Sequence, residues 1–147
     1  MMKSKKHAKS AWIANSTCVA KPWGEEISWA ALPSIHGKIL YIEAGTRTSY
    51  KYHKSKNEVL FVLKGEANVQ FGSEHTLEDP IGFPLKHALL EPGQCLNVQS
   101  GCPYRIEAIT DCEIVEISDG RSGESDKVRI EDDYGRETTS PKRGKNK

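Results

Sequence analysis

The chain has 147 residues, a net charge of +1 and 37% hydrophobic residues. This length suits one domain of ordinary size, large enough to bury a hydrophobic core. No apolar run approaches the roughly 20 residues that span a bilayer, and nothing resembles a secretory signal peptide. We therefore expect a soluble protein that has no membrane contact and is located in the cytoplasm.

Charge is distributed unevenly along the chain. Eight positive charges lie within the first nine and the last nine residues, so residues 10–138 carry about −7. The composition predicts disordered basic tails at residues 1–10 and 137–147 and a folded domain at residues 11–136. Because the tails show neither interleaved aromatic residues nor a Gly-Arg pattern, we expect no nucleic-acid partner.

The chain has four cysteines, Cys18, Cys95, Cys102 and Cys112, and none of them forms a CxxC pair. A domain of this size can build its core without disulfide bonds. Together with the absence of a secretion signal, this pattern predicts reduced thiols in a cytosolic protein.

The central part of the chain has the pattern of short strands separated by turn residues, without a helical period. The expected strands cover residues 38–43, 48–53, 58–63, 67–71, 88–91, 95–98, 104–108, 113–117 and 128–134. Residues 73–84 contain two prolines and a glycine, which predicts a loop or lid, and residues 120–126 are expected to be a connector. Several short strands at nearly regular spacing predict an all-β sandwich or barrel.

The strand expected at residues 58–63 is informative about the layers of the fold. Alternation puts Glu58 and Leu60 on one face and Val59 and Phe61 on the other. Both faces are largely apolar. We therefore expect one face to line a barrel interior and the other to meet a second sheet or a second subunit.

The candidate site lies in the segment from Gly45 to Gly65. Lys51 and His53 have the same parity on an extended strand, so their side chains point to one face. Glu58 opens the next strand and can meet them there. In a small β-barrel this face is the interior, where such a set of polar groups forms either a metal site or a polar ligand pocket. The residues alone leave both interpretations open.

The spacing of these residues resembles the first motif of cupins, with Lys51 where most cupins have a histidine. A second cupin motif fits Gly93 and Gly101, and it has Tyr104 in place of the last histidine ligand. The resemblance implies a single-domain cupin, that is, an all-β double-stranded β-helix or jelly-roll barrel, preceded by an N-terminal arm.

Further sequence blocks resemble one particular family within the cupins. Four blocks of the sequence are similar to blocks of type II mannose-6-phosphate isomerase domains. They are KPWG at residues 21–24, the segment 45–65, PYRIE at residues 103–107, and residues 126–136, which end in an acidic residue followed by Tyr-Gly-Arg. Such domains also occur fused to mannose-1-phosphate guanylyltransferases. The family implies a divalent metal, such as zinc, manganese or iron, and interconversion of an aldose phosphate with a ketose phosphate.

The metal ligands of that family are only partly present. Carried over position by position, they are Lys51, His53, Glu58 and Tyr104. A lysine ammonium has no lone pair, and a tyrosine with a pKa of ~10 is a poor ligand at neutral pH. His53 and Glu58 remain, whereas catalytic zinc sites use about three protein ligands. Waters, His75 or His87 would have to complete a metal site, so the sequence disfavours a tightly bound metal.

In the alternative interpretation, Lys51 takes the place of the metal. Its charge would pair with Glu58, which avoids an unpaired buried carboxylate. In an active version of this site, Lys51 polarises a sugar carbonyl and Glu58 or His53 moves the proton. Lys51, His53 and Glu58 are therefore the candidate catalytic residues.

Other polar residues are candidate ligand contacts. Tyr52 and Tyr104 have the chemistry to stack on a sugar ring and Arg47 to pair with a phosphate, although packing and solvated-charge roles are the simpler interpretations. Arg105 has the opposite parity to Tyr104, so we expect it to leave the interior and to serve as a structural ion-pair partner.

Two functions of different class follow from the sequence. The first is a mannose-6-phosphate isomerase-like cupin of phosphosugar metabolism with a modified metal site. The second is a non-catalytic cupin that binds a sugar, a sugar phosphate or a nucleotide sugar, and the lost ligands favour it. The expected partners are a small sugar or sugar phosphate and a second copy of the chain in a homodimer, while a monomer stays open.

Overall fold

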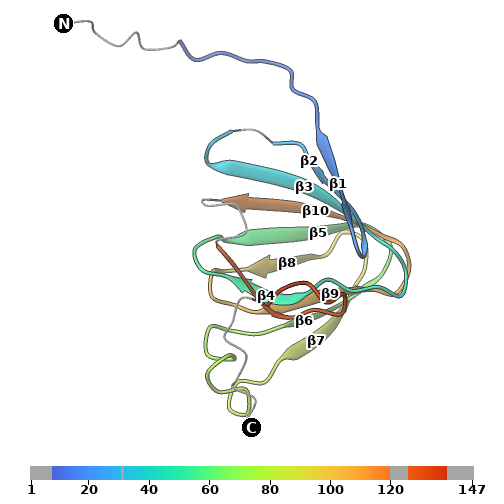
Figure 1. Ribbon diagram of the computed structural model, residues 1–147, viewed down its shortest axis with the longest axis vertical. Coiled ribbons are helices and arrows are strands. Elements are labelled where there is room, and N and C mark those ends of the chain that lie inside the picture. Colours follow the sequence, from blue (N-terminus) through green and yellow to red (C-terminus); the bar gives the residue numbers. More distant parts are fainter. Residues whose placement is uncertain (1–7, 31, 120–125, 139–147) are drawn as a thin grey trace, which may run out of the picture.

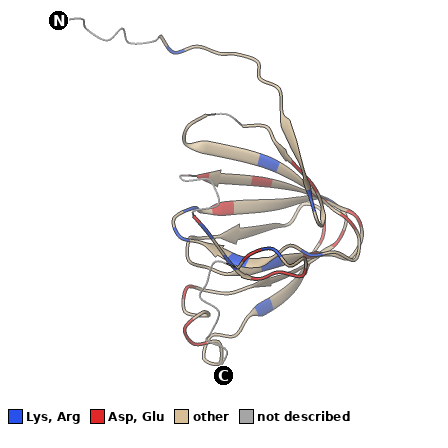
Figure 2. Cartoon of the chain, viewed as in Figure 1, with Lys and Arg blue, Asp and Glu red and all other residues tan. Residues whose placement is uncertain are grey.

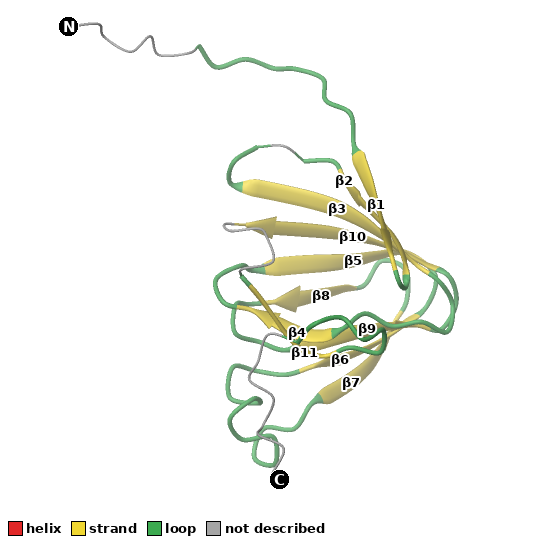
Figure 3. Ribbon diagram, in the orientation of Figure 1, coloured by secondary structure: helices red, strands yellow, loops and turns green. Residues whose placement is uncertain are grey.

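The computed structural model describes residues 8–30, 32–119 and 126–138 (Figure 1). These residues form strands and loops, with no helix among them (Figure 3). One antiparallel sheet has the order β1 (Thr17–Lys21), β2 (Gly24–Ser28), β3 (Ile35–Ile42), β10 (Cys112–Asp119), β5 (Glu58–Lys64) and β8 (Cys95–Val98). The other has the order β11 (Lys127–Glu131), β4 (Tyr50–His53), β9 (Tyr104–Ala108), β6 (Ala67–Phe71) and β7 (Lys86–Leu90). The predicted all-β fold is confirmed.

The strand pairing follows a jelly-roll pattern. The chain folds back at the loop between β6 and β7, and the strands then pair outward from that hairpin. β5 pairs with β8, β4 with β9 and β3 with β10, so successive strands alternate between the two sheets. This winding brings the strand that carries Lys51 and the strand that carries Glu58 to opposite walls of one barrel.

The core lies between the two sheets and is built by the period-2 alternation of the strands. On β5 the side chains of Leu60 and Val62 are buried, while Phe61 and Leu63 are exposed on the outer face. The predicted division of this strand into two faces is therefore correct. The predicted turn at Gly65 also forms, with a φ of 85°. A Cβ atom at this position would lie 2.2 Å from a backbone oxygen, so a side chain does not fit there.

The N-terminal region differs from the predicted arm in one respect. Residues 17–28 form the β1–β2 hairpin, and β2 pairs with β3 to extend the six-stranded sheet. Ile27 is the one apolar residue of β2, so strand propensity is weak there, and pairing with β3 supplies the missing stabilisation. Residues 8–16 do extend away from the barrel as an arm (Figure 1).

The structure also bears on the predicted loop, connector, tails and cysteines. Residues 72–85, between β6 and β7, contain no strand, as the predicted loop requires. The expected connector at residues 120–126 and the two basic tails fall largely outside the described residues. All four cysteines are free thiols. Within the described ranges, no helix has the length and apolar character that a bilayer crossing needs.

Candidate functional site

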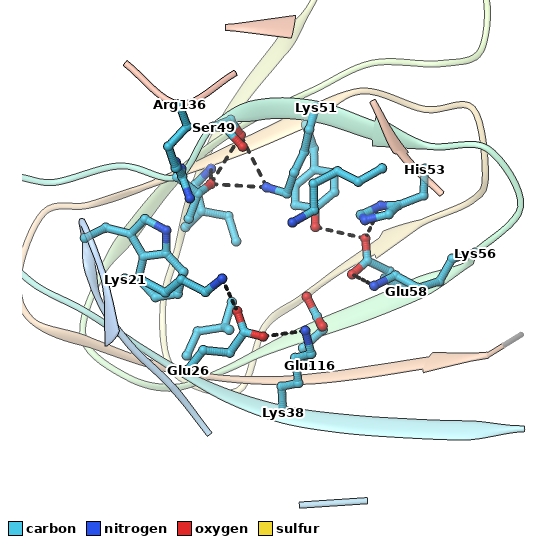
Figure 4. A pocket seen from close by; sticks show the side chains of 16 residues that line it. Lys21, Glu26, Lys38, Ser49, Lys51, His53, Lys56, Glu58, Glu116 and Arg136 are labelled. Atoms are coloured by element: carbon cyan, nitrogen blue, oxygen red, sulfur yellow. Dashed lines mark hydrogen bonds and ion pairs between the residues drawn. The ribbon is translucent and has the colours of Figure 1, made fainter. Parts of the chain in front are cut away.

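The barrel encloses a polar cavity of about 80 Å³ between the two sheets (Figure 4). Its charged lining residues are Lys21, Lys38, Lys51, Lys56, Lys127 and Arg136, together with Glu26, Glu58 and Glu116. Figure 2 shows charged residues on β3, β5 and β10, the strands that form one wall. A barrel interior is normally filled with apolar side chains, so this concentration of charge marks the candidate site.

At the centre of the site, Glu58 joins two residues of the opposite sheet. Its Oε1 accepts a hydrogen bond from Tyr104 Oη at 2.9 Å and one from His53 Nδ1, also at 2.9 Å. Its Oε2 lies 3.4 Å from Lys56 Nζ. The predicted meeting of His53 and Glu58 inside the barrel is confirmed by this geometry, and Tyr104 lies beside them, almost fully buried.

The protonation of this cluster follows from burial and from these contacts. Burial alone would raise the pKa of Glu58, but the hydrogen bond from His53 and the nearby Lys56 outweigh it and hold that pKa well below its ordinary value. Burial lowers the pKa of His53. Burial and the Glu58 charge raise the pKa of Tyr104 well above 10. At neutral pH the cluster therefore consists of a carboxylate that receives hydrogen bonds from a neutral imidazole and a neutral phenol.

Lys51 does not form the predicted ion pair with Glu58. Its Nζ donates to the backbone oxygen of Ser49 at 3.2 Å and to Thr48 Oγ1 at 3.5 Å, and it lies 4.4 Å from the centre of the Tyr104 ring. Lys56 Nζ is the lysine nitrogen that approaches Glu58, at 3.4 Å from its Oε2. Burial, followed by repulsion from Lys127, lowers the pKa of Lys51 to about 7.

Glu116 of β10 is a site residue that the sequence reasoning missed. It is buried, lines the cavity and points toward Glu58 (Figure 4). Burial, and then the neighbouring charge of Glu58, raise the pKa of Glu116 to about 8. At neutral pH this carboxyl group is therefore largely protonated. One signal was available in the sequence, since a glutamate shares its face with the apolar Ile114 in a predicted strand.

A second group of missed residues comes from the first three strands. Glu26 of β2 forms ion pairs with Lys38 of β3 and, at 3.8 Å, with Lys21 of β1. The approach of the two lysines holds the pKa of Glu26 below its ordinary value, although burial acts in the opposite direction. Lys21 and Glu26 were missed because β1 and β2 were not predicted as strands, and Lys38 was missed because its partner Glu26 lies in β2.

A turn between β4 and β5 holds Lys56 in place. The buried carboxylate of Asp126 accepts hydrogen bonds from the backbone N–H groups of Ser55 and Lys56, each at 3.1 Å. These bonds fix the turn, so that Lys56 points into the barrel toward Glu58. Asp126 therefore does not line the site itself but positions Lys56 by binding the backbone of the β4–β5 turn.

The closing segment, residues 127–136, begins with β11 at the edge of the five-stranded sheet and ends with Arg136 at the cavity. The guanidinium group of Arg47 forms two hydrogen bonds with Asp133, and Tyr134 Oη donates to the backbone oxygen of Arg47 at 2.8 Å. The buried Arg105 lies 3.5 Å from Asp133 and 3.6 Å from Glu131. The predicted structural role of Arg105 as an ion-pair partner is confirmed.

Some predicted candidates lie outside the cavity. Arg47 is engaged with Asp133, and Tyr52 has the opposite strand parity to Lys51, so neither residue lines the cavity. The predicted ligand contacts of Arg47 and Tyr52 receive no support from this geometry. His75 packs against Phe83 with a ring separation of 4.9 Å, and His87 is exposed on β7. Neither histidine reaches His53 and Glu58.

The residues present do not fit the divalent metal that the resemblance implies. Both His53 Nδ1 and Glu58 Oε1 are engaged with each other, and Tyr104 is a neutral donor. The ammonium group of Lys51 points into the same space, where it would repel a metal cation. Among the described residues, no group of three or more His, Cys, Asp and Glu side chains is arranged to hold a metal.

The comparisons with known proteins concern the fold. No protein-family model matches the chain, and no curated protein matches it in sequence. The capsular polysaccharide assembling protein CapF from Staphylococcus aureus superposes with a TM-score of 0.67 at 13% identity, over 82% of this chain and 33% of that chain. Oxalate decarboxylase from Bacillus subtilis has a TM-score of 0.67 at 15% identity, over 82% and 33%. KdgF from Halomonas sp. has a TM-score of 0.60 at 14% identity, over 74% and 90%.

The chain spans about a third of the length of CapF and of oxalate decarboxylase, and most of the length of KdgF. At these identities the likeness concerns the course of the backbone. It agrees with the outward pairing of strands from the β6–β7 hairpin and with the cupin motifs of the sequence. This chain therefore has the single-domain cupin fold.

Proposed function

We propose that this protein is a carbohydrate-related cupin that binds an anionic sugar derivative, such as a phosphosugar, in its barrel cavity without a metal. The sequence blocks similar to mannose-6-phosphate isomerases support a sugar-related ligand. The fold relative described as a capsular polysaccharide assembling protein provides a second link to carbohydrate. In the sequence motif, Lys51 occupies the position of one metal ligand of that family.

The observation that carries the proposal is the charge of the cavity lining. Six positive side chains and three carboxyl groups line it, and Glu116 is largely protonated at neutral pH. Of the positive groups, Arg136 is bound to Asp132 at 2.8 Å. The remaining lysines still outnumber the ionised carboxylates. Lys51 and Lys56 are buried and the other positive groups are partly exposed, so an anionic ligand that enters the cavity would meet a net positive lining.

Aldose–ketose isomerisation is the second candidate function, and the pair Glu58–Glu116 favours it. The reaction needs a base and an acid close to the same two carbon atoms. In this cavity Glu58 is ionised and the neighbouring Glu116 is largely protonated at neutral pH. Glu58 would therefore be the base and Glu116 the acid. Lys51 would stabilise the oxygen on which negative charge develops.

Thermal-shift and calorimetric titrations test this function. We expect mannose 6-phosphate or fructose 6-phosphate to raise the melting temperature, with a weaker effect from mannose and no requirement for added metal. Lys51→Met should remove the shift, whereas the control Lys54→Met, at an exposed position outside the cavity, should retain it. A shift that appears only with added zinc, manganese or iron would overturn the metal-free site. An isomerase assay on the same samples separates the two candidate functions.

We also propose that the protein forms a homodimer through the outer face of the six-stranded sheet. Phe61 and Leu63 of β5 and Ile117 of β10 are 38%, 50% and 47% exposed on this face. The arm at residues 8–16 carries Ile13, which is 98% exposed, and extends away from its own barrel (Figure 1). A second copy would cover both apolar features. Light scattering should give a dimer mass for the natural sequence and a monomer mass for Phe61→Asp.

The cytoplasmic location predicted from the sequence remains part of this proposal. The four free thiols support a reducing compartment. Cell fractionation of a tagged full-length chain tests it, and recovery in an oxidising compartment would contradict it.

A further inference from the structure

The lysines that line the barrel cavity do not have equivalent surroundings. Lys38 forms an ion pair with Glu26, and Lys56 lies 3.4 Å from Glu58. The contacts of Lys51 are of another kind, because its amino group meets a backbone oxygen, a threonine hydroxyl and the face of the Tyr104 ring. None of these three groups is a carboxylate. Lys51 projects from β4 into the cavity that Glu58 of β5 also lines (Figure 4).

An amino group in this position has a definite chemistry. Ion pairing holds the proton on a lysine and blocks its lone pair, whereas desolvation without a carboxylate partner favours the neutral, nucleophilic amine. The side chain of Lys51 is 9% exposed and reaches a cavity instead of filling packed core. The cavity is therefore a place where a carbonyl carbon can approach the nitrogen atom.

We propose that Lys51 forms a reversible imine with an aldehyde or ketone, such as the carbonyl end of an open-chain sugar, that enters the barrel. This covalent step goes beyond the proposed function, because neither sugar binding nor proton transfer between sugar carbons requires a bond to the protein.

The step balances with groups already present in the cavity. Lys51 Nζ adds to the carbonyl carbon, and the carbonyl oxygen takes up a proton to give a carbinolamine. The carbon–oxygen bond then breaks, the oxygen leaves as water, and a protonated imine remains. The proton that accompanies the departing water comes from Glu116, whose carboxyl group lines the same cavity next to Glu58. Hydrolysis reverses each step, so no oxidant or reductant is consumed.

The lining of the cavity defines a suitable probe. A carbonyl compound that enters it meets Lys51 together with the carboxylate of Glu58 and the largely protonated carboxyl group of Glu116. A small hydroxyaldehyde such as glycolaldehyde carries both the carbonyl group and a hydroxyl group that these side chains can contact.

Reductive trapping followed by peptide mapping tests the proposal. The full-length protein is incubated with glycolaldehyde and sodium cyanoborohydride at neutral pH, and adducts are assigned by mass spectrometry. We expect the peptide containing Lys51 to be modified at least about tenfold faster than the exposed Lys54, since buried amines without an ion-pair partner are the more nucleophilic.

Two variants provide matched controls. Lys51→Arg retains the positive charge but cannot form a trapped imine of this kind, so the fast phase of modification should disappear. Lys56→Met removes the buried lysine that pairs with Glu58 and should leave the Lys51 adduct in place. The proposal is overturned if Lys51 in the natural sequence is modified no faster than Lys54, or if Lys56 is the residue that reacts. Both of these outcomes are measured on the natural sequence, so the test does not depend on whether a variant folds.

The outcomes also separate this inference from the proposed function. If phosphosugars raise the melting temperature but Lys51 is not trapped, the imine is wrong and reversible binding stands. If Lys51 is trapped selectively but no sugar derivative binds, the nucleophile is correct and the sugar ligand is wrong.

Discussion

Tyr104 donates a hydrogen bond to the same oxygen of Glu58 that receives the Nδ1–H of His53, each at 2.9 Å. In the cupin motif, position 104 corresponds to a metal-binding histidine. Here a phenol binds the carboxylate directly. The position therefore still contributes to the site, but it connects the two sheets through a proton donor instead of a metal ion.

Removing this donor should destabilise the barrel. In Tyr104→Phe, Glu58 loses one of its two hydrogen bonds at Oε1, and we expect the free energy of unfolding to fall by about 1–3 kcal/mol. Urea denaturation measures the change. The control is Tyr52→Phe, a half-buried tyrosine outside the cavity, which should change stability by no more than about 0.5 kcal/mol. Equal losses in the two variants would contradict the role assigned to Tyr104.

The raised pKa of Glu116 predicts a pH dependence of stability. The native carboxyl group, with a pKa of about 8, holds its proton over a range in which the unfolded group, with a pKa near 4.5, has lost it. The native state binds more protons there, so this group makes stability fall as pH rises from about 4.5 to 8. Lys38 and Glu58 face the same group from β3 and β5.

Glu116→Gln removes this titration while retaining the shape of the side chain. We expect the variant to gain stability over the natural sequence as pH rises from 5 to 8, with a slope of at most about 1.4 kcal/mol per pH unit. Chemical denaturation at a series of pH values measures the difference. Parallel curves for the two proteins would show that Glu116 ionises normally.

The variant Lys51→Met should lose phosphosugar binding and gain stability. Burial lowers the pKa of Lys51 to about 7, so the native state binds fewer protons than the unfolded state between that pH and 10.5. This group therefore costs stability below about pH 10, and most at or below pH 7. Methionine fills similar space without the desolvation cost, and we expect a gain of about 1–3 kcal/mol at neutral pH. The same variant should lose phosphosugar binding, and a loss of both properties would indicate misfolding.

The closing segment should depend on Asp133. This carboxylate binds Arg47 and lies near the buried Arg105, so Asp133→Asn weakens both contacts. We expect faster hydrogen exchange over residues 127–136, with little change in the β5–β10 region. Glu131→Gln is the matched control, since Glu131 is 68% exposed and surface ion pairs contribute only about 0–1 kcal/mol. Uniform acceleration over the whole barrel would contradict a local role.

Two substitutions should recreate a metal site. The double variant Tyr104→His and Lys51→Gln removes the cation and supplies two ligand types next to His53 and Glu58. We expect it to retain about one divalent metal per chain after dialysis against zinc, manganese or iron, as in sites with three or more protein ligands. Elemental analysis compares it with the natural sequence, which should retain far less. Equal metal contents would show that other residues decide metal binding.

The sequence by itself determined the fold and the inner face of the site. Period-2 alternation in β5 put Glu58 and Leu60 on the buried side, and the shared parity of Lys51 and His53 put both of them inside the barrel. Gly65 lies between the strands predicted at residues 58–63 and 67–71, and the chain does turn there. These features are local, because strand parity and backbone conformation depend on neighbouring residues along the chain.

Only the tertiary structure decided which charges meet. Lys51 and Lys56 both line the cavity, but Lys56 lies 3.4 Å from Glu58 Oε2 whereas Lys51 Nζ donates to the backbone oxygen of Ser49. Glu116 joined the site because β10 lies between β3 and β5, a neighbourhood that strand order in the sequence does not reveal. The physical reason is that ion pairing and pKa depend on distances of a few ångströms between strands far apart in the chain, whereas alternation specifies only the face of each strand.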